Sequence, residues 1–267
     1  MNRYIEISVT ASESEQEQLI GMLSVLNPTG FEQTDGVLLT YFKEAQFHMQ
    51  EILDAMRGFV FTTRILEDQN WNEEWEKNFE PVLVGLFCGI RADFHKPIPN
   101  VKHEIIITPK MSFGTGHHDT TYMMVEQMNE LNFNNKTVFD FGTGTGILAI
   151  LACKLGARLI VASDNDEWSI SNAAENLEKN GCDTIKLIES SSLPGDMYNI
   201  ILANISKNVI MQNLSGLKTR LHQNGQLLLS GFLSEDEYDI VQDCAELGLV
   251  LEDCRHRGNW ILLQFRN

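Results

Sequence analysis

The chain has 267 residues, of which 43% are hydrophobic, and it carries a formal net charge of −17. This length allows one large domain or two smaller ones, and the hydrophobic content excludes a disordered protein. No apolar run is long enough to cross a membrane, and the first residues lack the apolar segment of a signal peptide. The five cysteines, an odd number without a Cys-x-x-Cys pair, are typical of reduced thiols. We therefore expect a soluble, cytoplasmic protein with no membrane partner.

The acidic charge is concentrated near the amino terminus. Residues 1–80 contain 15 acidic and 5 basic residues, a net charge of −10, which leaves −7 of the total −17 for the rest of the chain. Such a charge repels nucleic-acid phosphates and attracts a basic partner. Solubility alone would explain it equally well, so the charge is not by itself a functional signal.

Residues 1–66 are predicted to form a small α+β domain of the ferredoxin-like class. The expected elements follow one another as strand, helix, strand, strand, helix and strand, which is the split βαβ pattern. They are placed at 4–9, about 12–26, 31–34, 37–42, 45–56 and 59–66. This fold is a common docking module, but a fold alone does not define a function.

Residues 67–80 are predicted to form a linker helix between two domains. Trp71 and Trp75 are spaced as i and i+4, so they lie on one face of such a helix. This face is expected to pack against a domain, although two ordinary core tryptophans would have the same spacing.

Residues 81–267 alternate strands and helices, a pattern that predicts a mainly parallel α/β sheet. Strands are expected at 82–93, 104–108, 137–141, 159–164, 184–188, 197–202 and 226–230. Helices are expected at 122–131, 147–152, 167–180, 207–221 and 235–247. Two closing strands, 249–254 and 260–265, predict an antiparallel hairpin at the edge of this sheet.

The stretch from Thr137 to Asp164 has the strand, glycine turn, helix and strand of a unit that cradles a nucleotide. Its turn reads Gly142-Thr143-Gly144-Thr145-Gly146, so the third glycine comes one residue earlier than in a dinucleotide fingerprint. Asp140 precedes the turn, and an acid at this place is also unusual for dinucleotide binders. Both features favour S-adenosylmethionine. Asp140 can receive its ammonium directly or through water, and Asp164 can accept its ribose hydroxyls.

Asn204 follows a buried strand, at the edge where an open α/β sheet binds its ligands. Its side-chain oxygen can accept hydrogen bonds from an incoming amine, which makes it the candidate catalytic residue, although an asparagine here is more often a helix cap. The segment 111–121 is rich in glycine and hydroxyl groups and precedes a helix, whose N–H groups can face the negative end of a ligand. His117 and His118 have no acid or cysteine at a ligand spacing, so no metal site is expected.

Several segments of the chain resemble a known family. Asp140 to Gly146, together with Asp164, resembles the first two motifs of the seven-strand, Rossmann-like methyltransferases. Phe113 to Thr121, FGTGHHDTT, resembles the signature FGTGTHPTT of the PrmA family, which methylates large-subunit ribosomal protein eleven. Asn204-Ile205 matches the Asn-Ile of this family after its fourth strand, and Trp71 to Trp75 resembles its linker. The resemblance covers nearly the whole chain.

The resemblance implies an enzyme that transfers methyl groups from S-adenosylmethionine to the lysine ε-amines and N-terminal α-amine of a basic ribosomal protein, up to three times per amine. It implies that residues 1–66 recognise this substrate and that residues 81–267 are the methyltransferase domain. His117 stands where the family usually has threonine, and Asp119 stands where it has proline. The cofactor contacts of the family fall on Thr121, Gly142, Asp164 and Asn204, its signature adds Phe113 and Gly114, and the turn adds Asp140 and Gly144.

Four other functions remain open from the residues alone. A related methyltransferase could act on a lysine of a non-ribosomal protein. A nicotinamide oxidoreductase would use the same unit, but the early third glycine and Asp140 count against it. A non-catalytic binding module would not need Asp140, Asp164 and Asn204. A nucleic-acid methyltransferase is disfavoured by the charge of −17 and by Ala203-Asn204-Ile205-Ser206, where an Asn-Pro-Pro-aromatic motif would stand.

Overall fold

The computed structural model describes residues 4–24, 26, 28–34, 36–66, 80–108 and 116–267. The chain divides into two compact units, Met1–Asn78 and Phe79–Asn267. The division falls within the segment 67–80, but the linker helix expected there, with both of its tryptophans, lies outside the described residues. None of the described helices is long and apolar enough to cross a membrane.

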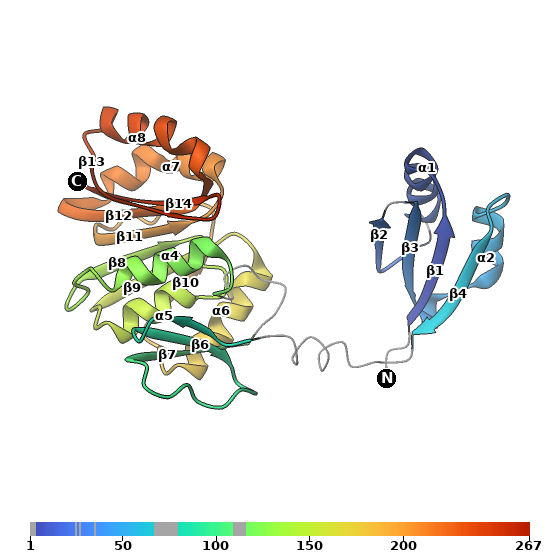
Figure 1. The fold of residues 1–267 in the computed structure, drawn as a ribbon, viewed down its shortest axis with the longest axis horizontal. Helices are drawn as coiled ribbons and strands as arrows, with labels where there is room; N and C mark the ends of the chain where they lie inside the picture. The colour runs from blue at the N-terminus through green and yellow to red at the C-terminus, as the bar shows by residue number, and fades with distance from the viewer. Residues whose placement is uncertain (1–3, 25, 27, 35, 67–79, 109–115) are drawn as a thin grey trace. The chain divides into compact units, whose positions relative to one another are not determined.

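The first unit is a four-stranded antiparallel sheet with two helices (Figure 1). Its elements are β1 (Tyr4–Thr10), α1 (Glu13–Ser24), β2 (Gly30–Thr34), β3 (Val37–Lys43), the 3-10 turn η1 (Glu44–Gln46), α2 (Met49–Ala55) and β4 (Phe61–Leu66). The sheet order β2-β3-β1-β4 is the predicted ferredoxin-like arrangement. Alternate residues of β1 point to one face. There Ile7 and Val9 pack in one core with Leu19 of α1 and Ile52 of α2.

The second helix of this unit is shorter than the predicted 45–56, because α2 begins only at Met49, after η1. Phe47 lies between the two with an extended backbone, and its ring packs edge-on against Phe42 at a centroid distance of 5.8 Å. Packing this aromatic ring against the sheet replaces the first turn of the predicted helix.

The second unit contains a seven-stranded sheet with the order β10-β9-β8-β11-β12-β14-β13. Its strands are β8 (Thr137–Phe141), β9 (Leu159–Asp164), β10 (Lys186–Glu189), β11 (Tyr198–Asn204), β12 (Leu221–Leu233), β13 (Val250–Arg257) and β14 (Trp260–Arg266). The first five strands in this order are parallel, and β14 runs antiparallel to both of its neighbours. The mainly parallel sheet and the antiparallel closing hairpin are therefore as predicted.

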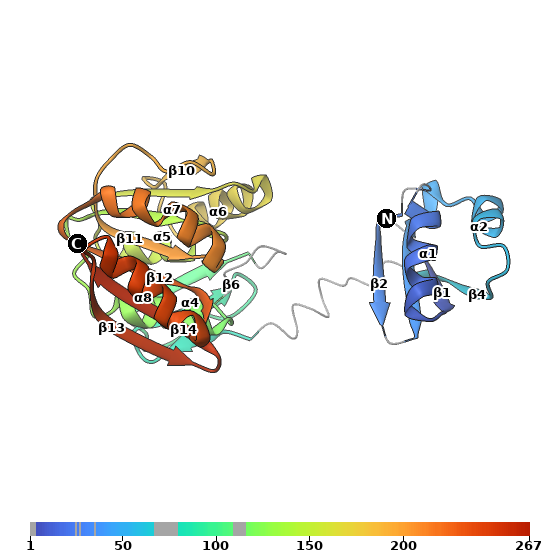
Figure 2. The same ribbon diagram turned by 90° about the horizontal axis from the view of Figure 1, so that it is seen from above.

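Helices cover both faces of this sheet. One core joins it to α4 (Asp119–Met128), α5 (Ile147–Lys154) and α6 (Glu167–Lys179). The other joins it to α7 (Lys207–Thr219) and α8 (Glu237–Glu246), which lie side by side in Figure 2. Because successive side chains of a strand point to opposite faces, Val138 enters the first core and Phe139 the second. The central strand β8 is thus buried on both faces.

The segment 82–93, predicted as one strand, forms two. β5 (Val82–Val84) turns back into β6 (Cys88–Ala92), which then pairs in parallel with β7 (His103–Ile107). Gly85 permits the reversal because it has a positive φ of 54°, and the N–H of Phe87 donates to the carbonyl of Val84. A continuous apolar run did not reveal where the chain turns.

Two further element boundaries differ from the prediction. β12 extends well beyond the predicted 226–230, because β11 and β14 pair with it on its two sides. α4 begins at Asp119 rather than at Tyr122. His118 caps it, since its Nδ1 accepts a hydrogen bond from the N–H of Thr120.

Candidate active site

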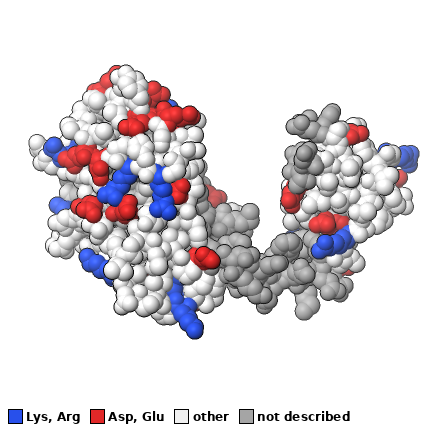
Figure 3. All heavy atoms as spheres, in the orientation of Figure 1, with Lys and Arg blue, Asp and Glu red and all other residues white. Residues whose placement is uncertain are grey.

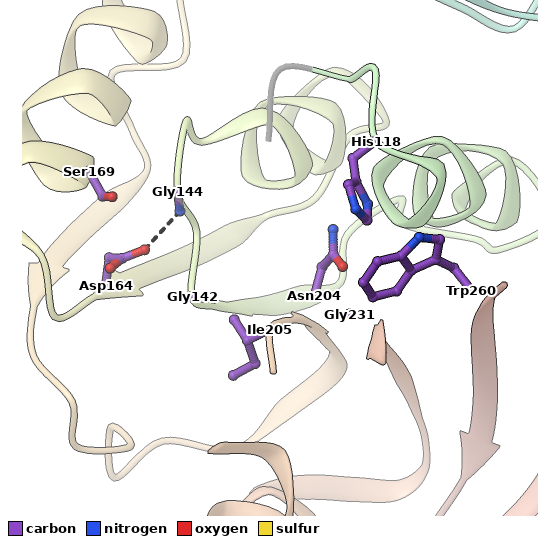
Figure 4. Close-up of a pocket in the computed structure, with 9 residues that line it drawn as sticks. All are labelled: His118, Gly142, Gly144, Asp164, Ser169, Asn204, Ile205, Gly231 and Trp260. Atoms are coloured by element: carbon purple, nitrogen blue, oxygen red, sulfur yellow. Dashed lines mark hydrogen bonds between the residues drawn. The ribbon is translucent and has the colours of Figure 1, made fainter. Parts of the chain in front are cut away.

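A cavity of about 320 Å³ opens at the carboxyl ends of the central strands, where an open α/β sheet binds its ligands. Figure 4 shows the residues that line it: His118, Gly142, Gly144, Asp164, Ser169, Asn204, Ile205, Gly231 and Trp260. Four of the predicted cofactor contacts are therefore brought together in one wall: Gly142, Gly144, Asp164 and Asn204.

A second cavity, of about 470 Å³, shares Gly142, Asp164 and Ile205 with the first. Its other walls come from the segment after β10, including Ser190, and from α7, including Gln212. The glycine turn and Asp164 thus lie between two neighbouring cavities. This arrangement suits an elongated ligand that is held at its middle.

The glycine turn needs glycine for two separate reasons. Gly142 has a φ of +76°, in the region that side chains rarely adopt. A Cβ on Gly142 would also lie 2.1 Å from Cγ2 of Ile205, so even alanine would displace the residue that follows Asn204. The N–H groups of Gly142 and Thr143 both donate to the carbonyl of Ser163, which binds the turn to the end of β9. The bare backbone therefore forms part of the cavity wall.

Asp164 ends β9 and faces both cavities. Its Oδ2 accepts a hydrogen bond from the N–H of Gly144 at 2.9 Å, and its Oδ1 accepts one from the N–H of Asp166 at 3.1 Å. Each carboxylate oxygen has two acceptor sites, so one remains open on each oxygen. The two backbone N–H groups orient the carboxylate, and its open sites can accept a pair of ligand hydroxyls.

Asp140 lies beneath the turn instead of in the cavity wall. Its side chain is 1% exposed, and its Oδ2 accepts a hydrogen bond from the hydroxyl of Thr143 at 2.7 Å. Burial is the main cause that raises the pKa of Asp140 to about 7, against the lowering effect of the Thr143 hydroxyl. Its Oδ1 has no hydrogen-bond partner among the described residues. Its direct contact with a ligand ammonium stays a prediction, whereas its contact with the turn is observed.

Asn204 lines the cavity, and Thr121, far from it in the sequence, contacts it from behind, fully buried and outside the cavity wall. Nδ2 of Asn204 donates to the Oγ1 of Thr121 at 3.3 Å, and this bond fixes which way the amide faces. Oδ1 of Asn204 has no partner among the described residues although the residue is only 8% exposed. Figure 4 shows the side chain facing His118 and Trp260. The structure therefore presents a buried, open acceptor to the cavity.

Trp260 and Gly231 line the cavity but were not predicted as site residues. The Trp260 ring packs edge-on against His118 at a centroid distance of 4.6 Å. Gly231 has a φ of +96°, and a Cβ there would lie 2.4 Å from the carbonyl oxygen of Ile205. A glycine directly after the predicted strand 226–230 was a usable signal for Gly231. Trp260 gave none, because only the closing hairpin brings it to the cavity.

Two predicted contacts, Phe113 and Gly114, lie outside the described residues. The histidines of the same segment have structural contacts. His118 caps α4 and lines the cavity, while the Nε2 of His117 lies 2.8 Å from the carbonyl oxygen of Glu80. His118 thus forms part of the cavity wall, and His117 contacts the segment that precedes β5.

The sheet order, with the two strands of an antiparallel hairpin at one edge, a glycine turn after β8 and an acid at the end of β9, defines a Rossmann-like methyltransferase domain. Enzymes of this class take the methyl group from S-adenosylmethionine.

The chain belongs to the family of ribosomal protein L11 methyltransferases, PrmA, whose family model matches residues 7–267. A ribosomal protein L11 methyltransferase of Porphyromonas gingivalis is 39% identical over 265 residues, which cover 95% of this chain and 91% of that protein. One of Chlorobaculum tepidum is 37% identical over 252 residues, with 88% and 87% covered. A crystal structure of a ribosomal protein L11 methylase from Lactobacillus delbrueckii subsp. bulgaricus superposes with a TM-score of 0.66 at 29% identity. It covers 70% of this chain and 98% of that one.

Proposed function

We propose that this enzyme methylates lysine ε-amines and the N-terminal α-amine of ribosomal protein L11. The carrying observation is the open Oδ1 of Asn204, a buried acceptor in the wall of the cavity that the glycine turn and Asp164 also line. Family membership and the names of the relatives support the choice of substrate. The open acceptor supports an amine as the group that is modified.

The residues of the cavity fit S-adenosylmethionine. Among the described residues, the carboxylate of Asp164 keeps two acceptor sites for the ribose hydroxyls, and Gly142 and Gly144, both with positive φ, present bare backbone to the cavity. The buried carboxyl of Asp140 lies one layer below, where its charge favours the ligand's ammonium. When bound, this donor supplies an electrophilic methyl group, whose carbon an uncharged amine can attack in line while the sulfur leaves as a neutral thioether.

Asn204 positions the amine, and desolvation at the cavity favours the uncharged form of that amine. An unperturbed lysine has a pKa of about 10.4 and an α-amine one of about 7.7–8.0, so both must lose a proton before they can react. Oδ1 of Asn204 accepts one N–H of the amine, while the bond from its Nδ2 to Thr121 prevents the amide from turning. The apolar walls formed by Ile205 and Trp260 exclude water, and this desolvation lowers the pKa of the bound amine. The proton leaves to the solvent.

The first unit docks the protein substrate. Residues 1–80 carry −10 of the net charge, which complements a basic ribosomal protein. The same acidity disfavours a nucleic-acid substrate. On the face drawn in Figure 3, several basic side chains of the second unit lie beside acidic ones and others stand singly, so no single basic patch forms there. Arg255 and Arg257, for example, pair with Glu126 and Asp119. The enzyme acts in the cytoplasm, where ribosomal proteins are made.

The test is to incubate the full chain with methyl-labelled S-adenosylmethionine and ribosomes from cells that lack this activity. Mass spectrometry then identifies the labelled component. Label in ribosomal protein L11 is expected, and it should be absent with the Asn204→Ala variant. Label in ribosomal RNA, or in no ribosomal component, would overturn the proposal. Label in another protein's lysine would support the related lysine methyltransferase instead.

The docking role has its own test. A chain without residues 1–66 should bind S-adenosylmethionine with the affinity of the full chain, because the cavity is built entirely from the second unit. It should no longer methylate ribosomal protein L11. Calorimetry measures the first property and labelled-methyl transfer the second. Full activity of the shortened chain would contradict the docking role.

A further inference from the structure

Three potential metal ligands meet at the sheet edge, outside the methyl-transfer cavity. Cys254 and His256 lie two residues apart on the edge strand β13, so both side chains point to the same face. Glu237 begins α8, which packs on that face. The ligand atoms of the three side chains all lie within 4.8 Å of one another. They form a thiol, imidazole and carboxylate set, the three ligand types that zinc takes in proteins.

The distances between these atoms match the edges of a metal coordination tetrahedron. Sγ of Cys254 lies 3.4 Å from Nε2 of His256 and 3.8 Å from Oε1 of Glu237. Nε2 of His256 lies 3.6 Å from Oε2 of Glu237. A tetrahedral zinc ion, with bonds of about 2.0–2.1 Å to nitrogen and oxygen and about 2.3 Å to sulfur, holds its ligand atoms about 3.3–3.6 Å apart. Because the two distances to Glu237 involve different carboxylate oxygens, one oxygen must still approach both other ligand atoms, from within 4.8 Å, to complete the tetrahedron.

The position of Ser234 favours the tautomer of His256 in which Nε2, the nitrogen near Cys254, can bind a metal ion. The hydroxyl of Ser234 lies 3.2 Å from the carbonyl oxygen of Asn259, to which it donates its single proton. The same oxygen lies 3.2 Å from Nδ1 of His256, so it accepts that N–H. In the tautomer with the ring proton on Nδ1, Nε2 directs its lone pair toward Cys254 and Glu237, where the cation would bind. Such a second partner on the ring is usual for metal-bound histidines.

We propose that Glu237, Cys254 and His256 bind a divalent cation of the zinc class, with a fourth position open to water. A carboxylate and a thiolate would balance the charge of such a cation. Without it, burial and the neighbouring Glu237 raise the pKa of Cys254 to about 11, so the thiol keeps its proton. On binding, the sulfur exchanges this proton for the metal, and the proton leaves to the solvent.

The site would tie α8 to the edge of the sheet. Ser234 contacts both His256 and Asn259, and Asn259 directly precedes Trp260 in the cavity wall. A cation held there stabilises the closing hairpin without entering the cavity. The proposal is independent of the methylated substrate, because none of its three ligands lines the cavity of about 320 Å³.

The test uses Co²⁺ as a visible probe for the full chain, followed by competition with Zn²⁺. One equivalent should bind and give a sulfur-to-cobalt absorption band together with the visible bands of tetrahedral cobalt, and Zn²⁺ should displace it. Cys254→Ser should lose the sulfur band. His256→Gln should weaken Co²⁺ binding at least roughly tenfold. The matched controls are Cys153→Ser, at another half-buried thiol, and His222→Gln, at another exposed histidine.

Both controls should behave as the parent chain. No sulfur band in the parent chain, or a band that survives Cys254→Ser, would overturn the proposal, and so would a band lost in Cys153→Ser. Circular dichroism of each variant shows whether it is folded. If Cys254→Ser fails to fold, His256→Gln decides the question, because its side chain is 51% exposed and its loss leaves the core unchanged.

Discussion

The polar side chains at the two ends of strands β8 and β11 differ in their hydrogen bonding. At the amino ends, Thr137 and Asn199 satisfy each other. The N–H of Thr137 donates to Oδ1 of Asn199 at 3.0 Å, and the N–H of Asn199 donates to Oγ1 of Thr137 at 3.1 Å. At the carboxyl ends of three neighbouring strands, Oδ1 of Asp140, Oγ of Ser163 and Oδ1 of Asn204 are buried without a partner among the described residues.

This difference separates stability from function within one sheet. A buried polar atom without a hydrogen bond costs about 1–3 kcal/mol, so three such atoms together destabilise the folded state considerably. The amino end of β11 has one exception, the hydroxyl of Tyr198, which has no partner among the described residues but belongs to a core aromatic ring stacked on Phe139 at 5.2 Å. Of the three at the carboxyl ends, Oδ1 of Asn204 belongs to the cavity wall, where a ligand can complete its hydrogen bonds, while Asp140 and Ser163 are buried behind the glycine turn that forms part of this wall. The amino ends hold the strands together, and the carboxyl ends are prepared for a ligand.

The comparison is tested most strongly by Asn204→Ala. Loss of its open acceptor removes the group that positions the amine, so kcat/KM for ribosomal protein L11 should fall roughly 10²–10³-fold, the range for one positioned dipole in an active site. The free energy of unfolding should fall by only about 0.5–1.5 kcal/mol, because the change removes the bond from Nδ2 to Thr121, whereas Oδ1 has no partner among the described residues. Initial rates with labelled donor and urea unfolding measure the two effects. A strong loss of stability with full activity would show that the carboxyl ends of these strands serve stability and not function.

Asp140→Asn tests the buried charge through pH. The pKa of Asp140 is raised to about 7 in the folded chain, and it is about 3.9 in an unfolded one. Between these values the folded chain binds more protons, so the free energy of unfolding of the parent falls as pH rises. Relative to the parent, the variant should gain stability on the order of 4 kcal/mol from about pH 4 to about pH 8, with a plateau above the folded pKa.

Urea unfolding across this pH range measures the effect of Asp140→Asn. The exposed Asp183→Asn is the control and should follow the parent at every pH. A difference between Asp140→Asn and the parent that is the same at all pH values would mean that Asp140 keeps its ordinary acidity in the folded chain.

Asp164→Ala tests whether the second acid of the unit binds the cofactor. Removal of charged hydrogen bonds worth about 1.5–3 kcal/mol should weaken binding of S-adenosylmethionine roughly 10- to 100-fold. Isothermal titration calorimetry measures this affinity. Asp166→Ala removes a nearby carboxylate that caps α6 through the N–H of Ser169. It should lower stability by about 1 kcal/mol and leave the affinity nearly unchanged. Equal affinities for the parent and Asp164→Ala would contradict the cofactor assignment.

Asn199→Ala is the matching change at the amino end and has the smallest expected effect. It removes the acceptor of the Thr137 N–H, so the free energy of unfolding should fall by about 1–2 kcal/mol. Binding of S-adenosylmethionine and kcat/KM should stay within a factor of about two, because Asn199 does not line either cavity. Chemical denaturation measures the free energy of unfolding, calorimetry the affinity, and initial rates kcat/KM. A clear loss of affinity would show that the two ends are not independent.

Local patterns were sufficient for most of the fold. Alternation predicted β1, and the apolar run before Gly142 predicted β8, because a strand buried on both faces needs apolar residues at nearly every position. The element order of residues 1–66 predicted the sheet order of the first unit. The sequence also indicated Asp164 and Asn204 as site residues, since the ends of parallel strands lie at one edge of a sheet. The missed turn at Gly85 shows the limit, because an apolar run has no mark where it reverses.

What the sequence determined by itself is therefore local: the glycines that a positive φ requires, the strand periods and the acids that end them. Tertiary structure decided which distant groups meet. It buried Asp140 below the turn, joined Thr121 to Asn204 and brought Trp260 from the closing hairpin into the cavity. It also assembled the cluster of Glu237, Cys254 and His256, whose spacing along the chain matches no metal motif. Packing decides such contacts, because no local periodicity specifies which side chains two distant elements present to each other.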